Sequence, residues 1–307
     1  MLYSGLLLFL FSTLLYFPVI SLNILLAVRF IHGTAFGIAA TTIATAVVDL
    51  IPDERKGEGV SYFSLSPTAG TALGPFIGLY ILQRADFTMI FAACTFFSAI
   101  SLIIVLFSKI PEASITKEQL QALKSRFSIH NFFEKKALPI SIMMVPMGIA
   151  YSGIVSFLNS YAIEIQLQDA AAYFFIVYSI FLFISRPFTG RLLDLKGDNV
   201  VIYPAILLFS LSLLLLGQAH SGFALLLAGV LVALGFGTLM SCSQAIAIKE
   251  SPKHRVGLGT STFFICMDGG MGVGPFLTGL LVPFFEYRGM YLTLAVVVLL
   301  SIILRVK

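Results

Sequence analysis

Long apolar runs separated by short polar stretches dominate the pattern of this chain. Ala85 to Phe107, Ile140 to Ile163 and Leu280 to Leu304 each reach or approach the roughly 20 residues that cross the hydrocarbon core of a bilayer. The runs are continuous and do not alternate between apolar and polar positions, so they predict helices rather than barrel strands. The pattern therefore predicts an all-α integral membrane protein.

Ten spans follow from these runs, and one sizeable polar segment, 108–138, leaves four spans before it and six after it. The predicted spans are 2–20, 22–50, 58–82, 87–107, 139–163, 170–190, 200–219, 222–249, 257–283 and 286–305. An even number of spans places both ends of the chain on the same side of the membrane.

The distribution of basic residues predicts the orientation of these spans. One set of loops and ends carries sixteen Lys and Arg residues, whereas the opposite set carries only Arg84 and Arg288. Cytoplasmic loops are enriched in Lys and Arg, so the first set, with both termini, is expected in the cytoplasm and the protein in the cell membrane.

Composition limits the classes of function. Of the 307 residues, 58% are hydrophobic and 11% are charged, against about 25% charged in soluble domains. Neither a Walker A sequence nor a G-x-S-x-G or H-E-x-x-H motif is present, so the sequence supports neither an ATP-driven pump nor an enzyme. We expect no cofactor, metal or nucleic-acid partner.

An internal repeat relates residue n to residue n + 200 without a gap. Identical residues at this offset include the glycines, prolines and arginines that set backbone geometry and loop charge. They are Pro52, Arg55, Gly57, Gly59, Gly70, Gly74, Pro75 and Phe76, matched by Pro252, Arg255, Gly257, Gly259, Gly270, Gly274, Pro275 and Phe276. Corresponding spans run in the same direction, which predicts two parallel repeats.

The offset also predicts a larger architecture. Residues 139–200 have counterparts numbered before 1, so about two spans and a loop of the first repeat are expected to be missing. We predict four spans of a first bundle in 1–107, a cytoplasmic linker in 108–138, and six spans of a second bundle in 139–307.

The segment from Gly70 to Leu79 reads GTALGPFIGL and resembles motif C, gxxxGPxxGG, of the Major Facilitator Superfamily. Small residues at this spacing let two helices approach closely, and a proline bends the helix. The resemblance implies a twelve-helix transporter of the drug:proton antiporter branches, of which this chain covers helices three to twelve. Generic helix packing is the alternative. The motif residues are Gly70, Gly74, Pro75 and Gly78, repeated as Gly270, Gly274 and Pro275.

Arg29 begins a segment, RFIHGTAFG, that is similar to the family's motif B. The resemblance implies that Arg29 takes part in proton coupling, and the alternative is that its side chain extends to the outer interface. His32 lies one turn further on the same face and shares that site or hydrogen-bonds a neighbouring helix. Asp268, an acid well inside a predicted span, is the third proton-coupling candidate or else a structural hydrogen-bonding residue.

The segment GRLLDLKGDN, which starts at Gly190, is similar to motif A, GxLaDrxGrk. The resemblance implies a cytoplasmic gate in which Asp194, by pseudo-symmetry, faces the span that begins near Gly57 to Ser61. The alternative is a plain stop-transfer loop. The gate candidates are Arg186, Gly190, Arg191, Asp194 and Gly197.

Polar residues in two other spans are candidates for lining a substrate cavity. They are Tyr151, Ser156, Asn159 and Gln244. Spacing alone does not separate cavity lining from hydrogen bonds between helices.

We therefore expect a secondary active transporter, acting as a monomer, that couples protons to the efflux of small amphipathic solutes or drugs by alternating access. One alternative is an importer or facilitator of the same fold. The other is a truncated membrane protein that does not transport.

Overall fold

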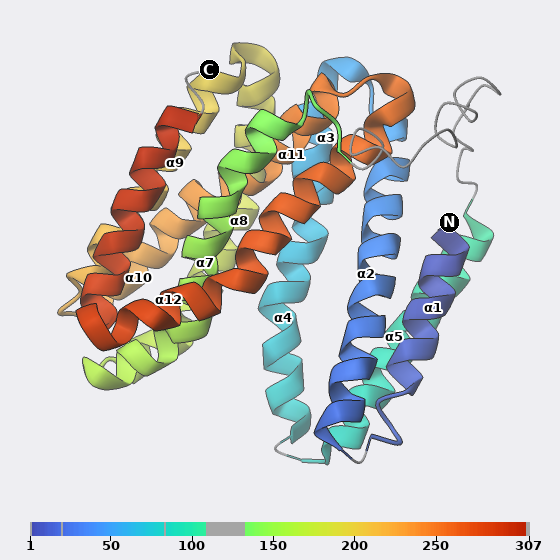
Figure 1. The fold of residues 1–307 in the computed structure, drawn as a ribbon, viewed down its shortest axis with the longest axis horizontal. Coiled ribbons are helices and arrows are strands. Elements are labelled where there is room, and N and C mark those ends of the chain that lie inside the picture. The colour runs from blue at the N-terminus through green and yellow to red at the C-terminus, as the bar shows by residue number, and fades with distance from the viewer. Residues whose placement is uncertain (1, 20, 83, 109–132, 305–307) are drawn as a thin grey trace. The chain divides into compact units, whose positions relative to one another are not determined.

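The computed structural model describes residues 2–19, 21–82, 84–108 and 133–304, and within these ranges it is helical without strands (Figure 1). The helices are α1 Leu2–Leu14, α2 Leu22–Leu50, α3 Lys56–Phe63, α4 Leu65–Leu82, α5 Phe87–Phe107, α7 Leu138–Glu164, α8 Gln168–Lys196, α9 Asp198–Gly217, α10 Gly222–Val232, α11 Thr238–Glu250 and α12 Val256–Leu300. Short turns complete the set: 3-10 turns η1 Asp53–Arg55, η4 Lys253–Arg255 and η5 Ser301–Leu304, and the π-helical turn η3 Ala233–Gly237. The predicted helical class is confirmed.

Seven helices within the described ranges are long and apolar enough to cross a membrane. Two of the predicted spans are shaped differently from the prediction. Span 2–20 ends as a helix at Leu14, and span 58–82 is broken at Ser64, whose hydroxyl and amide both bond to the carbonyl of Val60. The predicted break between spans 257–283 and 286–305 is confirmed, because α12 consists of two helices that meet at a kink at Glu286, where φ is 57°.

Two compact units divide the chain by its contacts: residues 1–50 with 73–115, and residues 51–72 with 116–307. We call them unit 1 and unit 2. Residues 109–132 of the predicted linker lie outside the described part. The bundle boundaries at 107 and 139 stay a prediction, because units 1 and 2 divide the chain at other positions.

Unit 1 is built on α1, which packs against α2 and α5. Leu2 and Leu6 of α1 and Ala39 of α2 are buried together, with Leu102 of α5 packed against them. Gly5 allows this approach, because a Cβ there would stand 2.9 Å from the side chain of Ile38 and 3.1 Å from the backbone of Ala39.

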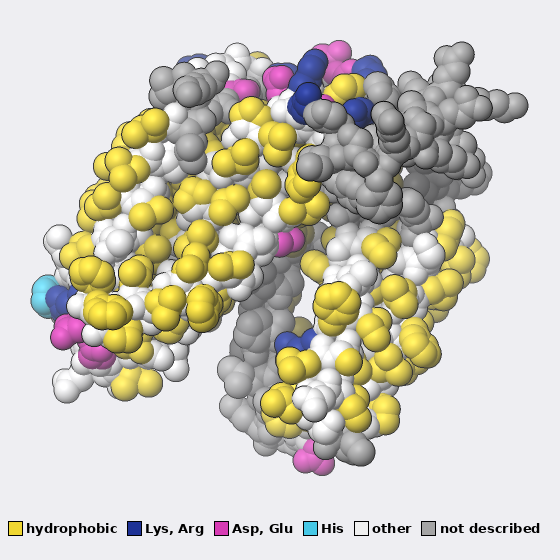
Figure 2. All heavy atoms as spheres, viewed as in Figure 1, with side chains coloured by type: hydrophobic (Ala, Val, Ile, Leu, Met, Phe, Trp, Pro, Cys, Tyr) yellow, Lys and Arg dark blue, Asp and Glu magenta, His cyan; other side chains and the backbone are white. Residues whose placement is uncertain are grey.

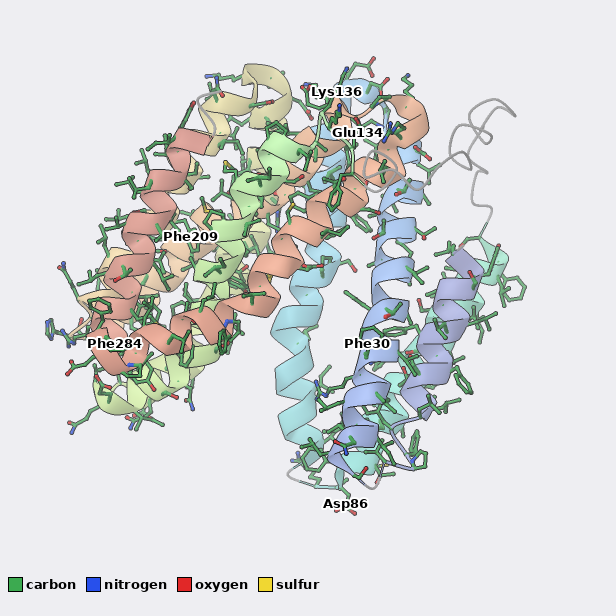
Figure 3. All side chains as sticks on the ribbon, viewed as in Figure 1. Phe30, Asp86, Glu134, Lys136, Phe209 and Phe284 are labelled. Carbon is green, nitrogen blue, oxygen red and sulfur yellow. The ribbon has the colours of Figure 1, made fainter. Side chains whose placement is uncertain are left out.

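Unit 2 has a densely packed interior. Its α12 lies along α7 and α9, and α8 lies along α3 and α10. Phe209 on α9 is fully buried, whereas Phe284 on α12 is 82% exposed (Figure 3). Figure 2 shows hydrophobic side chains spread over the visible face of this unit and most of the charged ones near the ends of its helices. Such a surface fits contact with lipid chains rather than with water.

The repeat is visible in the backbone of two loops of unit 2. Pro52 has φ −55° and ψ 144°, and its repeat counterpart Pro252 has φ −57° and ψ 144°. Each proline is followed by a 3-10 turn that ends at an arginine with φ −122°, Arg55 in one loop and Arg255 in the other. At these loops the predicted offset of 200 residues is confirmed.

Candidate functional site

Asp194, near the end of α8, accepts hydrogen bonds from the first amides of α3, and we call this contact the clasp. The Gly57 N–H donates to Oδ1 at 2.8 Å, and the Glu58 N–H donates to Oδ2 at 2.9 Å. The first amides of a helix lack partners within the helix and carry partial positive charge, so a carboxylate is well placed there. The predicted position of Asp194 is confirmed, and its gating role stays a prediction.

Two glycines allow the clasp to form. A Cβ at Gly190 would collide with the carbonyl of Gly57 and the hydroxyl of Ser61, and one at Gly57 would stand 2.7 Å from Oδ1 of Asp194. After Asp194 the chain turns through Gly197, whose φ of 83° suits glycine. Gly190 of the motif A-like segment and Gly57 of α3 are therefore required by the close approach of α3 and α8, and Gly197 by the turn that follows α8.

Ion pairs surround the clasp at the same end of unit 2, which we call the Asp194 end. Lys253 Nζ lies 3.0 Å and Lys56 Nζ 3.6 Å from the Asp53 carboxylate. The hydrogen bond and charge of Lys253, with the charge of Lys56, hold the pKa of Asp53 below its usual range.

A second pair at this end is more enclosed. Arg255 Nε lies 2.7 Å from Oε2 of Glu134, whose side chain is 6% exposed, and the Glu134 N–H donates to Oγ1 of Thr262 on α12 at 2.9 Å. Figure 3 labels Glu134 at the beginning of the described segment that leads into α7. The pair thus ties that segment to the beginning of α12.

Arg186, another predicted gate residue, does not join the clasp. It is 1% exposed, and none of its three guanidinium nitrogens has a hydrogen-bond partner among the described residues. Its electrostatic neighbours are Tyr178 on the same helix and Cys242 on α11. Arg191, by contrast, is exposed.

The four cavity candidates divide into two pairs. Tyr151 and Gln244 are buried inside unit 2, at 6% and 2% exposure, and the Tyr151 ring stacks on Phe236 of η3 with centroids 4.0 Å apart. Ser156 and Asn159 are exposed on α7. The structure therefore does not bring all four candidates to one surface.

In unit 1, His32 belongs to the contact between α1 and α2. The Tyr16 hydroxyl lies 3.1 Å from Nδ1 of His32, the Thr13 hydroxyl lies 3.5 Å from Nε2, and the Phe9 ring centroid is 4.4 Å from the imidazole. Arg29, one turn earlier, is exposed. These contacts favour a packing role for His32 and leave the Arg29 guanidinium accessible.

Asp268 lies on the face of α12 that does not pack against α7. A Cβ built at Gly270 would collide with the carbonyl of Val145 on α7. A Cβ built at Gly148 on α7 would stand 2.6 Å from the carbonyl oxygen of Met267 on α12. Asp268 and its neighbour Gly269 project from the opposite side, where no described atom lies within 4 Å of a Cβ built at Gly269. The carboxylate is thus presented away from the α7–α12 contact.

The sequence pointed to Arg186 but not to its surroundings. The predicted span 170–190 already contained Arg186, so its position inside an apolar run was the available signal that it differs from loop arginines. Nothing in the sequence marks Tyr178 or Cys242 as a neighbour of Arg186. A group of three or more His, Cys, Asp or Glu side chains that could hold a metal ion does not occur within the described part of the chain.

Comparisons with known proteins identify the family. The model described as Major Facilitator Superfamily matches residues 1–267 and 168–306. An uncharacterized MFS-type transporter of Methanocaldococcus jannaschii is 26% identical over 294 residues, which cover 91% of this chain and 73% of the relative. The staphylopine export protein of Staphylococcus aureus is 21% identical over 292 residues, covering 90% and 71%.

The fold likeness extends over nearly the whole chain. The crystal structure of the human organic anion transporter MFSD10 (TETRAN) superposes with a TM-score of 0.75 at 16% identity, covering 99% of this chain and 76% of that one. At this identity the likeness speaks for the fold alone. The chain belongs to the Major Facilitator Superfamily and is a multi-span membrane transporter rather than an enzyme.

Proposed function

We propose that this protein exports small amphipathic solutes in exchange for protons, by alternating access. The motif C-like glycines support the export direction, and so does the likeness to the staphylopine export protein. The excess of basic residues in one set of loops supports a cytoplasmic position for the Asp194 end and for both termini, in the cell membrane.

One observation carries the proton coupling. Asp268 is an acid in the middle of α12, on a face flanked by glycines and turned away from α7. An ionised carboxylate at this depth is costly unless it faces water or a partner, and gaining or losing a proton changes that cost by several kcal/mol. Protonation of Asp268 therefore biases which transport state is favoured. Arg29, accessible on α2, modulates this step.

The clasp at the Asp194 end supplies the reversible closure that alternating access requires. Its carboxylate holds two amides of α3 by charge-assisted bonds, which contribute about 1.5–3 kcal/mol each when both partners are buried and less at a surface. Gly190 and Gly57 permit the contact, Gly197 forms the turn after α8, and Arg191, next to Gly190 in the chain, is exposed. Opening the cytoplasmic side breaks these bonds, and reclosing the clasp restores them.

The test is proton movement in proteoliposomes with a trapped pH dye. Anionic, neutral, zwitterionic and cationic amphipathic solutes are added one at a time, and solute-dependent proton flux is measured for wild type and Asp268→Asn. The asparagine keeps the shape and hydrogen-bonding capacity but carries no titratable proton. We expect the flux to disappear while downhill exchange of the same solute persists.

Asp169→Asn is the matched control, because it makes the same chemical change at an exposed residue in the first turn of α8 of the same unit. Its flux should equal that of wild type. Undiminished proton flux in Asp268→Asn would overturn the coupling role of Asp268.

A further inference from the structure

Arg186 is a buried charge that the rest of unit 2 does not compensate. All three guanidinium nitrogens lack a hydrogen-bond partner, and the described residues offer no ion pair to it. Proteins bury a cation only with an anion or a set of acceptors to match it, since an isolated buried charge is strongly unfavourable. The geometry around Arg186 therefore calls for an anion that the described residues do not supply.

The helix packing fixes which surface Arg186 faces. A Cβ at Gly229 of α10 would meet Phe174 of α8, and one at Gly237 of η3 would meet Leu182. Further along the same contact, the Cys242 thiol approaches the carbonyl of Thr189 at 3.9 Å. Arg186 lies between Leu182 and Thr189 on α8, so its side chain belongs to the contact with η3 and the start of α11.

The beginning of α11 carries further buried polar groups that have no partner among the described residues. The hydroxyls of Thr238 and Ser243 and the amide Nε2 of Gln244 are buried without a hydrogen-bond partner among the described residues. All three lie on the first two turns of α11. Unsatisfied buried groups are uncommon in native structures and call for an explanation. Thr238 lies one turn before Cys242, so its hydroxyl is on the side of α11 that faces α8 at Thr189.

Aromatic rings lie next to the beginning of α11. Tyr151 stacks on Phe236, a residue of the π-helical turn, and its ring centroid lies 6.1 Å from that of Tyr178 on α8. A π-helical turn interrupts the regular backbone ladder and is frequent at functional sites. It also separates α10 from α11, so α11 has a point at which it can move relative to α8.

We infer that Arg186, with the Thr238 hydroxyl of α11, binds the carboxylate of an amphipathic organic anion, and that the Tyr151–Phe236 pair takes up the apolar part of the same molecule. This inference rests on the proposed transport function and names its substrate class. A guanidinium binds a carboxylate through two parallel charge-assisted hydrogen bonds. In the present conformation the site is closed, and movement of α11 at η3 opens it to the substrate.

Cys242 provides a direct reporter of this site, because it is fully buried and interacts electrostatically with Arg186. In a Cys94→Ser, Cys266→Ser background Cys242 is the single thiol. The protein is placed in lipid nanodiscs without any ion gradient, and the rate of Cys242 alkylation is measured. Three probes share one ring and differ in charge: benzoate, benzyl alcohol and benzylamine.

We expect benzoate to slow the alkylation in a saturable way, and benzyl alcohol and benzylamine to have little effect. Arg186→Gln should weaken benzoate protection at least tenfold. Arg186→Lys should weaken it less, because the charge remains but the two-pronged geometry is lost. Lys196→Gln removes one positive charge from an exposed position on the same helix and is the control. In this variant benzoate should protect Cys242 as well as it does in the unmodified background.

A second measurement guards against misfolding of the variants. Without ligand, Arg186→Gln should unfold at the same temperature as the parent or a higher one, because an uncompensated buried charge has been removed. Equal protection by all three probes, protection by none, or full benzoate protection in Arg186→Gln would overturn the inference. Binding is measured without a gradient, so its failure is distinct from a failure of proton-coupled export.

Discussion

The two copies of the glycine-proline motif have similar sequences and different surroundings. In α12, a Cβ at Gly270 would run into the carbonyl of Val145, and one at Gly274 would stand 3.0 Å from the Cα of Ile149, both on α7. In α4, nothing among the described residues lies within 4 Å of a Cβ built at Gly70, Gly74 or Gly78. The side chain of Pro75 lies outside the described part.

The difference shows that such a motif specifies a surface for close approach and does not supply the helix that approaches. In unit 2 the partner is α7, Leu138–Glu164. Among the described residues no helix stands in that place beside the glycines of α4. Glycine spacing in a sequence is therefore evidence of helix packing only together with the element that completes it.

The largest effect should come from filling one glycine of each copy. Gly270→Leu places a side chain where the backbone of α7 already lies, and we expect a loss of about 3 kcal/mol or more, as for severe overpacking. Gly70→Leu meets open space and also gains helix propensity, so its stability should change by less than about 1 kcal/mol. Unfolding curves of the two variants in the same detergent measure this difference.

Gly270→Ala is the graded control, because a single methyl group already reaches the Val145 carbonyl. Its stability against unfolding should lie between that of wild type and that of Gly270→Leu. Equal losses in Gly70→Leu and Gly270→Leu would mean that α4 is packed as tightly as α12, and the comparison would fail.

The sequence predicted those parts of the molecule that local chemistry determines. Apolar runs located the helices, and the repeated Pro52 and Pro252 located two loops whose backbones agree closely. The offset also placed Asp194 opposite the beginning of α3, as its hydrogen bonds to Gly57 and Glu58 confirm.

The features that the sequence did not predict depend on packing between helices. The break at Ser64 and the π-helical turn η3 both interrupt runs that are uniformly apolar or helical in sequence. The isolation of Arg186 depends on what α11 presents to it, and no residue near Arg186 in the sequence reveals that. Tertiary contacts overrule local preference at such positions.

A second, smaller effect contrasts two arginines at equivalent repeat positions. Arg255 lies 2.7 Å from Glu134 with side chains 28% and 6% exposed, whereas Arg55 lies 4.0 Å from Glu58 with side chains 76% and 29% exposed. Breaking an enclosed pair leaves a charge without its partner, so Glu134→Gln should cost about 2 kcal/mol after allowance for the partial exposure of Arg255. Glu58→Gln should cost at most about 1 kcal/mol.

Double-mutant cycles with Arg255→Gln and Arg55→Gln isolate the pair energies from other effects of each change. Unfolding midpoints at low and high salt supply the data, and only the exposed pair should weaken appreciably with salt. A coupling energy for Arg55–Glu58 as large as that for Arg255–Glu134 would contradict the contrast.

The smallest effect concerns Asp53 and Lys253, which occupy equivalent positions of the two repeats, carry opposite charges and lie 3.0 Å apart. Lys253 donates a hydrogen bond and supplies a positive charge, and together with the charge of Lys56 it lowers the pKa of Asp53. Because this pKa is lower in the folded than in the unfolded protein, the pair contributes stability above the unfolded pKa. That contribution disappears as the pH falls through the lower, folded value, in a window below about pH 4.

Lys253→Gln should raise the pKa of Asp53 towards its usual range, and Lys253→Arg should leave it low. The measurement is a carboxyl carbon chemical-shift titration of Asp53, with Lys196→Gln as the control for loss of one positive charge elsewhere. An unchanged Asp53 pKa in Lys253→Gln would show that the two repeats do not interact through these side chains.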